Sequence, residues 1–223
     1  MEHGIKITSL DGAKELCLTV SQGILLQSFA APTPAPKTYT AEIDGRSGTL
    51  DYTDYFGAVK YQNRPVTATV NIAKRFNQLQ QLEYHSKILT EWHGERVKLY
   101  YWGQPDRYYL GRLSIGDLTK ESGVFSLSLD AEPYAYIITA RKYTVTATEA
   151  EQVLTVENRG KAIMPTITVE TDTAVTIIIN GQTYSLSAGT FNYIDIQLAK
   201  AAKTDIRYSG AGTITFDYRE LVL

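Results

Sequence analysis

The chain has 223 residues, of which 43% are hydrophobic and 21% are charged, a balance that excludes an intrinsically disordered protein. The formal net charge is −2, and residues 1–137 and 138–223 are each nearly neutral, so neither part has the basic surface of a nucleic-acid-binding protein. The single cysteine, Cys17, excludes an internal disulfide, and its apolar neighbours predict a buried thiol. Short apolar runs and the absence of a signal-like start predict a soluble protein assembled in the cytoplasm of the producing cell.

Proline and alternating hydrophobic residues organise the first half of the chain. Residues 31–38 are rich in proline and predict an exposed arm or loop edge. The run 66–72 alternates apolar and polar residues, which is typical of a strand with one buried face. Residues 74–92 instead place apolar side chains at near-helical spacing, and Gly94 follows where such a helix would stop. Alternation returns and predicts further strands at 97–101 and 125–129.

A change in composition near residues 134–142 predicts a boundary between two domains, 1–137 and 138–223. The second part is dense in threonine and has the strand spacing of a small β-sandwich. Within it, Asn180-Gly181 predicts a two-residue hairpin, because a type I′ turn needs positive φ at both central residues. We therefore expect a mainly β protein with one helix. The strands predicted in the second part are 175–179, 182–186, 194–198 and 214–218.

The residue types that carry most enzyme chemistry form no recognisable catalytic pattern in this sequence. His85 and His93 lie outside any zinc-binding motif, so we expect no metal and no cofactor. The sequence therefore favours a structural or interaction protein over an enzyme. Two acidic pairs could flank a glycosidic bond, although solvated acids near turns are the simpler explanation; they are Asp51 with Asp54 and Glu149 with Glu151.

Several short motifs follow one another along nearly the whole chain. They are Gly45-Arg46-Ser47-Gly48 before Leu50-Asp51, Tyr61-Gln62-Asn63-Arg64 before an alternating strand, Pro133-Tyr134-Ala135-Tyr136, Asn158 with Gly160, and the closing stretch 212–220. In this order and spacing, the motifs resemble those of phage distal tail proteins, the family called Dit. The helix predicted at 74–92 also falls where that family has one.

The resemblance implies an architecture and a role. It implies an N-terminal β-rich domain with one amphipathic helix, followed by a C-terminal galectin-like β-sandwich. It further implies a hexameric ring, single or stacked, at the distal end of a long non-contractile tail of a phage or prophage. The expected partners are other copies of the chain, the tail tube protein, the tail-associated tip protein and receptor-binding proteins. The resemblance implies no enzyme activity, no recognition of nucleic-acid sequence and no membrane insertion, and it places the protein in the virion.

A ring of identical subunits needs head-to-tail contacts, and such contacts favour aromatic residues and arginine. Tight turns and packing inside the domain are the competing explanation for the same residues. We expect Arg46→Glu or Arg64→Glu to weaken assembly and to leave the fold mostly intact. The Pro-rich segment 31–38 could add contacts by strand addition. The candidate interface residues are Gly45, Arg46, Gly48, Asp51, Tyr52, Tyr55, Phe56, Tyr61 and Arg64.

A carbohydrate- or receptor-binding module that recognises host cell-wall glycans is the alternative function. Tyrosine rings can stack on sugar faces, and the second domain offers Tyr184, Tyr193 and Tyr208 as candidate glycan contacts. Packing within the sandwich is the competing explanation for these rings. A glycan-degrading enzyme is a third reading, which the absence of tryptophan from the second domain disfavours.

Overall fold

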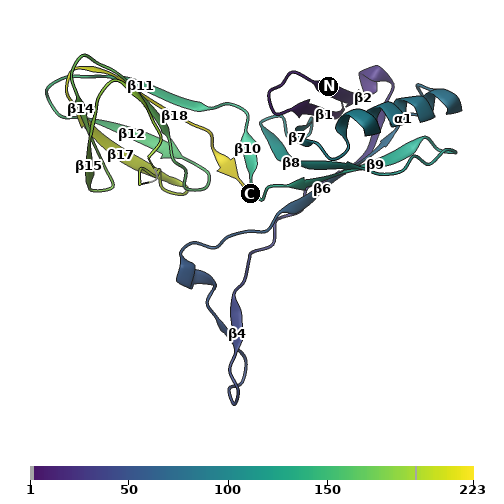
Figure 1. The fold of residues 1–223 in the computed structure, drawn as a ribbon, viewed down its shortest axis with the longest axis horizontal. Helices are drawn as coiled ribbons and strands as arrows, with labels where there is room; N and C mark the ends of the chain where they lie inside the picture. Colours follow the sequence, from purple (N-terminus) through teal and green to yellow (C-terminus); the bar gives the residue numbers. More distant parts are fainter. Residues whose placement is uncertain (1–2, 194) are drawn as a thin grey trace. The chain divides into compact units, whose positions relative to one another are not determined.

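The computed structural model describes residues 3–193 and 195–223, apart from the side chain of Phe56. The chain folds into two compact units, of which the first ends at Ala135 and the second runs from Tyr136 to Val222 (Figure 1). The short strands β10 (Ala135–Ile137) and β19 (Leu221–Val222) pair with each other.

The N-terminal unit is built on an antiparallel sheet with the strand order β2-β1-β7-β8-β9-β6-β3. The sheet curls, so that Phe29 of β3 stacks on Tyr101 of β7 with ring centres 4.0 Å apart. Alternating residues of the strands fill the core, as the sequence predicts for 66–72, 97–101 and 125–129. The strands are β1 (Gly4–Ser9), β2 (Glu15–Thr19), β3 (Leu25–Ala30), β6 (Arg64–Asn71), β7 (Arg96–Tyr101), β8 (Arg107–Ile115) and β9 (Val124–Ala131), with the short helix η1 (Val20–Gln22) between β2 and β3.

The predicted helix is present as α1 (Gln78–Trp92), which begins later than the expected residue 74. Its start is set by Asn77, whose side chain accepts a hydrogen bond from the Gln80 N–H at 3.0 Å while the Gln80 side chain accepts one from the Asn77 N–H at 3.1 Å. This capping box satisfies backbone donors that the helix itself leaves unpaired. Gly94 has a φ of +82° just beyond the helix, as expected for a stop at that position.

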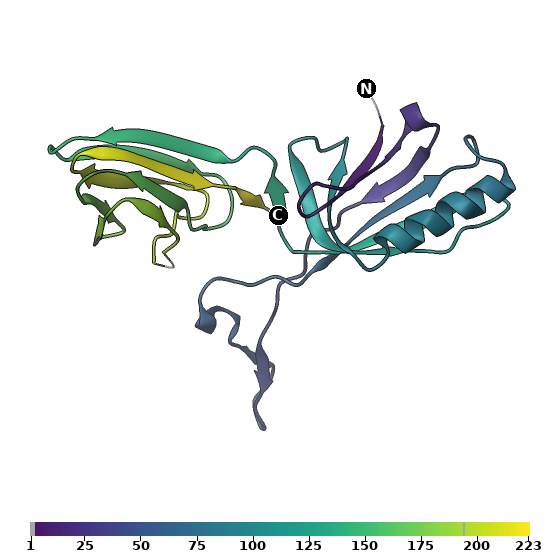
Figure 2. The same ribbon diagram turned by 45° about the horizontal axis from the view of Figure 1, so that its top comes forward.

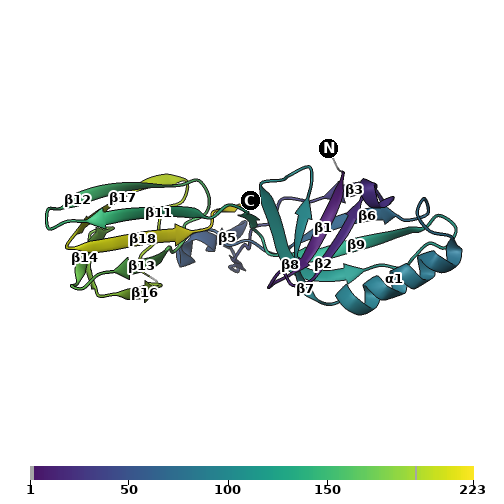
Figure 3. The same ribbon diagram turned by 90° about the horizontal axis from the view of Figure 1, so that it is seen from above.

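The C-terminal unit is a sandwich of two antiparallel sheets, β11-β18-β13-β16 and β12-β17-β14-β15 (Figure 3). Both sheets contribute to one apolar core, in which Ile167 and Phe216 of the first sheet lie with Ile177 and Ile206 of the second. The strands are β11 (Arg141–Ala147), β12 (Gln152–Asn158), β13 (Thr166–Glu170), β14 (Val175–Ile179), β15 (Gln182–Leu186), β16 (Gly189–Phe191), β17 (Ala202–Ser209) and β18 (Gly212–Tyr218).

Two predictions in this unit have opposite outcomes. The Asn-Gly hairpin is confirmed, since Asn180 and Gly181 connect β14 to β15 with φ of 54° and 78°. The prediction of a strand at 194–198 is wrong for residues 195–198, and Ile194 lies outside the described residues. The Ile196 N–H bonds to the Tyr193 carbonyl at 3.2 Å, which bends the chain, and Leu198 forms only an isolated bridge to Ile163. Ile196 and Leu198 are buried, so the alternating pattern reports the burial of their side chains and not a strand paired with a neighbour.

Between β3 and β6, residues 31–63 leave the N-terminal sheet as a long hairpin, here called the arm (Figure 2). Its two legs are joined by backbone hydrogen bonds from Lys37 N–H to the Lys60 carbonyl at 2.7 Å and from Gln62 N–H to the Ala35 carbonyl at 2.8 Å. The exposed, proline-rich extension expected at 31–38 is therefore confirmed as its outgoing leg. Farther out, the arm contains the paired strands β4 (Thr40–Glu42) and β5 (Thr49–Asp51) and the short helix η2 (Thr53–Phe56).

Candidate functional site

The tip of the arm carries the first group of predicted site residues. Gly45 and Gly48 have φ of +80° and +82°, and a Cβ atom on either would meet nothing within 4 Å. The two glycines therefore serve the turn through their backbone conformation, which favours glycine. The Arg46 N–H bonds to the Ile43 carbonyl at 3.1 Å within this turn, and the Arg46 side chain is exposed.

A second group of predicted residues surrounds the return from β5. Asp51 Oδ1 accepts a hydrogen bond from the Thr53 N–H at 2.8 Å, and hydrogen bonds from the side chain and backbone of Thr53 hold the pKa of Asp51 below its ordinary value. The Tyr52 N–H bonds to the Tyr39 carbonyl at 2.7 Å across the legs. The result is a shallow concavity lined by Tyr39, Tyr52 and Tyr55, with the Tyr55 side chain 80% exposed. The Phe56 side chain lies outside the described part of the chain.

The arm buries little of its own surface. Every described side chain between residues 35 and 63 is exposed or half-buried. A two-stranded hairpin without a hydrophobic layer is only marginally stable in water. Large exposed rings such as Tyr39 and Tyr55 are typical of a surface that another protein covers. The arm is therefore the strongest candidate for a contact surface in the N-terminal unit.

The motif Tyr61-Gln62-Asn63-Arg64 lies at the root of the arm, where the return leg rejoins the sheet. The Tyr61 ring meets the Tyr134 ring edge-on, with centres 5.9 Å apart. The Asn63 side chain donates a hydrogen bond to Asp130 at 3.2 Å. The structure thus brings together two motifs that are distant in the sequence, and it uses them to attach the arm to the body of the unit.

Arg64 differs from the other predicted interface residues because its side chain is only 4% exposed. Its Nη1 donates to the Pro32 carbonyl at 3.3 Å, and its guanidinium lies 5.1 Å from the centre of the Tyr109 ring. Burial lowers the pKa of Arg64. Arg64→Glu would place a carboxylate in this buried position, so the expectation that this substitution leaves the fold mostly intact needs correction. The alternation of side chains along β6 could have predicted this burial, because Arg64 shares the buried face of the strand with Val66 and Val70.

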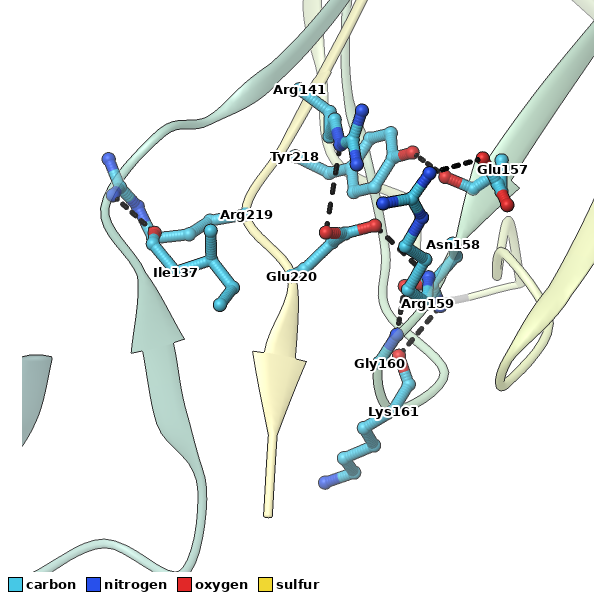
Figure 4. A network of polar contacts seen from close by, with 10 residues as sticks. All are labelled: Ile137, Arg141, Glu157, Asn158, Arg159, Gly160, Lys161, Tyr218, Arg219 and Glu220. Carbon is cyan, nitrogen blue, oxygen red and sulfur yellow. Dashed lines mark hydrogen bonds and ion pairs between the residues drawn. The ribbon is translucent and has the colours of Figure 1, made fainter. Parts of the chain in front are cut away.

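In the C-terminal unit, the motif residues Asn158 and Gly160 form a buried turn (Figure 4). The Asn158 side chain donates to the carbonyls of Lys161 at 2.8 Å and Ala199 at 2.9 Å, and it accepts from the Gly160 N–H at 3.1 Å. Asn158 is fully buried, so these bonds satisfy an amide that would otherwise be costly to remove from water. The turn after β12 is fixed by this one side chain.

The closing motif reaches the same place from the other end of the unit (Figure 4). Glu220 pairs with Arg141 at the start of β11 and receives the backbone N–H of Arg159. The Tyr218 hydroxyl donates to the Glu157 carbonyl, and burial raises the pKa of Tyr218. These contacts tie the first and last strands of the unit to the turn after β12, which is a structural task.

The tyrosines proposed as glycan contacts do not share one environment. Tyr208 is only 8% exposed and belongs to the sandwich core. Tyr184 and Tyr193 are half-buried with ring centres 5.6 Å apart, and Phe191 stacks on Tyr193 at 5.7 Å. Tyr184 and Tyr193 therefore lie together, whereas Tyr208 lies inside.

His85, His93 and Cys17 each make a contact within the N-terminal unit. His85 Nε2 lies 2.9 Å from the Gly116 carbonyl, and His93 Nδ1 accepts from the Ile115 N–H at 3.1 Å, so both attach α1 to the end of β8. Cys17 is half-buried rather than buried, and its Sγ donates a hydrogen bond to the Glu15 carboxylate at 3.0 Å. Among residues 3–193 and 195–223, no His, Cys, Asp and Glu side chains gather in a group of three or more that could hold a metal ion. None of the helices in the same residues is long and apolar enough to span a membrane.

No protein-family model and no curated protein matches this sequence. A solved structure does match: the crystal structure of the Dit (gp 19.1) protein of SPP1, described as a paradigm of the hub adsorption apparatus in phages that infect Gram-positive bacteria. The TM-score is 0.66 at 16% sequence identity, over 98% of this chain and 99% of that chain. This chain has the Dit fold. The resemblance carried by the short motifs is thereby confirmed for the fold.

Proposed function

We propose that this chain is a structural hub protein at the distal end of a long non-contractile phage tail. The observation that supports this proposal is the Dit fold, which extends over nearly the whole of both chains. Fold alone does not fix function. The exposed, aromatic arm adds independent support, because a hub must present surfaces that other subunits cover.

In this proposal, six copies form a ring that joins the tail tube to the tail-tip and receptor-binding apparatus. Residues 1–137 form the ring and residues 138–223 form a sandwich domain. The ring uses head-to-tail contacts, in which one patch of each copy meets a different patch of the next. The arm supplies one of these patches through Arg46, Asp51, Tyr52 and Tyr55, which Gly45 and Gly48 help to present. The protein is assembled in the bacterial host cytoplasm, becomes part of the virion and acts without catalysis or cofactor.

Light scattering of the purified chain over a wide concentration range tests the ring. A mass of six chains is the expected result. A chain that stays monomeric alone, and also when mixed with tail tube and tip proteins, would overturn the proposal. A deletion variant tests the role of the arm. It lacks residues 38–59, and a short turn closes the gap. This variant should stay folded and lose assembly, because the deleted residues contribute little to the core.

Glycan binding by the C-terminal unit is the second candidate function, and one observation favours it. Tyr184 and Tyr193 place two half-buried rings side by side, and the flat faces of tyrosine rings can pack against sugars. The test is a cell-wall glycan array probed with the full chain and with Tyr193→Ala. Binding that is lost in the variant would support this function, and a flat array would remove it.

A further inference from the structure

One buried cation, Arg64, contacts both the outgoing leg of the arm and the body of the N-terminal unit. Arg64, the first residue of β6, lies at the end of the return leg, and its Nη1 donates to the Pro32 carbonyl of the outgoing leg at 3.3 Å. Its guanidinium lies over the Tyr109 ring of β8, 5.1 Å from the ring centre. The hydroxyl of Tyr109 is in turn held by the Gln104 side chain. Arg64 therefore joins both legs of the arm to the body of the N-terminal unit.

The surface beneath Arg64 is an aromatic layer built from three strands. Tyr109 of β8 lies against Phe29 of β3, with ring centres 6.2 Å apart, and Phe29 stacks on Tyr101 of β7 at 4.0 Å. The outgoing leg follows directly from β3, so Phe29 fixes the strand from which the arm departs. The guanidinium of Arg64 thus lies over the Tyr109 ring, which is itself packed against Phe29.

The electrostatic environment of Arg64 is unfavourable for a residue that serves only packing. Its Nε and Nη2 atoms are buried and make no hydrogen bond with any described residue. The neighbouring Arg107 pairs with Asp106 at 2.9 Å, and no described carboxylate forms an ion pair with Arg64. Burying a cation without a carboxylate raises the free energy of the folded state, and an apolar side chain of similar size would fill the same space without this desolvation penalty. The arginine is therefore best explained by its charged head, which holds the Pro32 carbonyl beside the Tyr109 ring.

We propose that Arg64 is a positioning residue that fixes the direction in which the arm leaves the N-terminal unit. It does so by holding the Pro32 carbonyl beside the Tyr109 ring, and it touches no partner itself. The inference rests on the proposed function in one respect, namely that the arm is a contact surface. Direction matters because a strand rises about 3.3 Å per residue, so legs from residue 36 to 45 reach roughly 30 Å and a tilt of roughly 10° moves the tip by roughly 5 Å.

Hydrogen exchange of the full chain, read by mass spectrometry, tests this role. Arg64→Met should accelerate exchange at the Lys37 and Gln62 amides by about tenfold or more, because the outgoing leg loses its hydrogen bond from Arg64 at Pro32. Arg64→Lys, which keeps a cation over the ring and one donor, should restore most of the protection. The matched control is Arg107→Met, which removes a neighbouring arginine that bonds to Asp106 instead of the arm. It should leave exchange in the arm unchanged.

A merely structural role predicts a different pattern. In that case Arg64→Met would lower the melting temperature of the N-terminal unit and accelerate exchange throughout it. Our proposal predicts an unchanged or higher melting temperature with faster exchange confined to the arm. Wild-type exchange at the arm root in Arg64→Met, or no recovery in Arg64→Lys, would overturn it.

A second pair of variants covers the case in which Arg64→Met fails to fold. Tyr109→Phe keeps the ring and should preserve arm protection, whereas Tyr109→Leu removes the ring and should lose it. Equal exchange in the two variants would overturn the proposal. These measurements use the free chain, so they decide the role of Arg64 even if light scattering shows that the wild-type chain never forms a ring.

Discussion

Glu220 Oε1 accepts a hydrogen bond from the Arg159 N–H at 3.0 Å, across 61 positions of sequence. The other carboxylate oxygen lies 3.6 Å from Arg141 Nε. Glu220 is only 4% exposed, so both contacts form largely away from bulk water. One carboxylate therefore fixes the end of β18 against both the turn after β12 and the start of β11.

Removing this carboxylate should destabilise the C-terminal unit selectively. Glu220→Ala should lower its free energy of unfolding by about 2–4 kcal/mol, because a partly buried N–H and a partly buried cation lose their partner. Glu220→Gln keeps an acceptor for the N–H and should have a smaller effect. Urea unfolding followed by circular dichroism measures the change. Trp92 and Trp102 both lie in the N-terminal unit, so their fluorescence transition should not move and serves as an internal control.

The turn beside β5 should loosen in acid. Hydrogen bonds from Thr53 stabilise the Asp51 carboxylate, and its pKa lies below the ordinary 3.8. A lowered carboxyl pKa contributes stability that is complete above the ordinary value and is lost as the pH falls through the lowered one. Carbon NMR titration of the Asp51 carboxyl should therefore give a midpoint below 3.8. Thr53→Val should raise that midpoint, and an unchanged midpoint would contradict the assignment.

Substituting alanine for two glycines with positive φ tests the cost of backbone conformation apart from the cost of steric contact. A Cβ at Gly181 meets nothing within 4 Å, yet its φ is +78°. Gly181→Ala should destabilise the C-terminal unit by about 1 kcal/mol, purely through backbone conformation. Gly45→Ala imposes the same strain at the arm tip, where it should leave both melting transitions unchanged because the tip supports no core. Thermal unfolding of the two variants provides the comparison.

Tyr55 offers the sharpest test of the arm as a contact surface. Its side chain is 80% exposed, so Tyr55→Ala should leave the melting temperature of the free chain within about a degree of wild type. Assembly should fall by about tenfold or more, because exposed tyrosines at interface centres contribute strongly to binding. Leu79→Ala is the matched control, since Leu79 is 67% exposed on α1 outside the arm. Equal assembly of the two variants would exclude Tyr55 from the contact.

Charge reversal at two arginines should now give two different results. Arg46→Glu lies at the exposed arm tip and should weaken assembly without changing stability. Arg64→Glu buries an unpaired carboxylate and should destabilise the N-terminal unit by about 3–5 kcal/mol. Tryptophan fluorescence during urea unfolding distinguishes the two. Equal stability of both variants would mean that the buried position tolerates either charge.

Features with a local cause were predictable from the sequence. The strand near 66–72 follows from period two, and the hairpin at Asn180 follows from the φ values that its turn requires. The strand at 194–198 failed because alternation reports which side chains are buried and does not report whether a neighbouring strand pairs with them. The same limit applies to Tyr208, which has a stacking side chain but faces the core.

Features that depend on contacts between distant segments were not predictable. The sequence contains Asn158 and Glu220 as separate motif residues, but their meeting around one turn depends on how β12 and β18 are placed. Tyr61 could not be assigned to Tyr134 from spacing, because 73 positions of unrelated sequence separate the two rings. The arm root is therefore a result of tertiary structure, although each of its residues was visible in the sequence.

The arm departs from β3 and returns to β6, and these two strands are antiparallel neighbours in the sheet. Shortening or lengthening the arm therefore leaves the strand order intact, since a tight turn could close the same pair. Natural variants could gain or lose residues here in steps without passing through an unfolded intermediate. The length of the arm can thus change during evolution independently of the sheet that carries it.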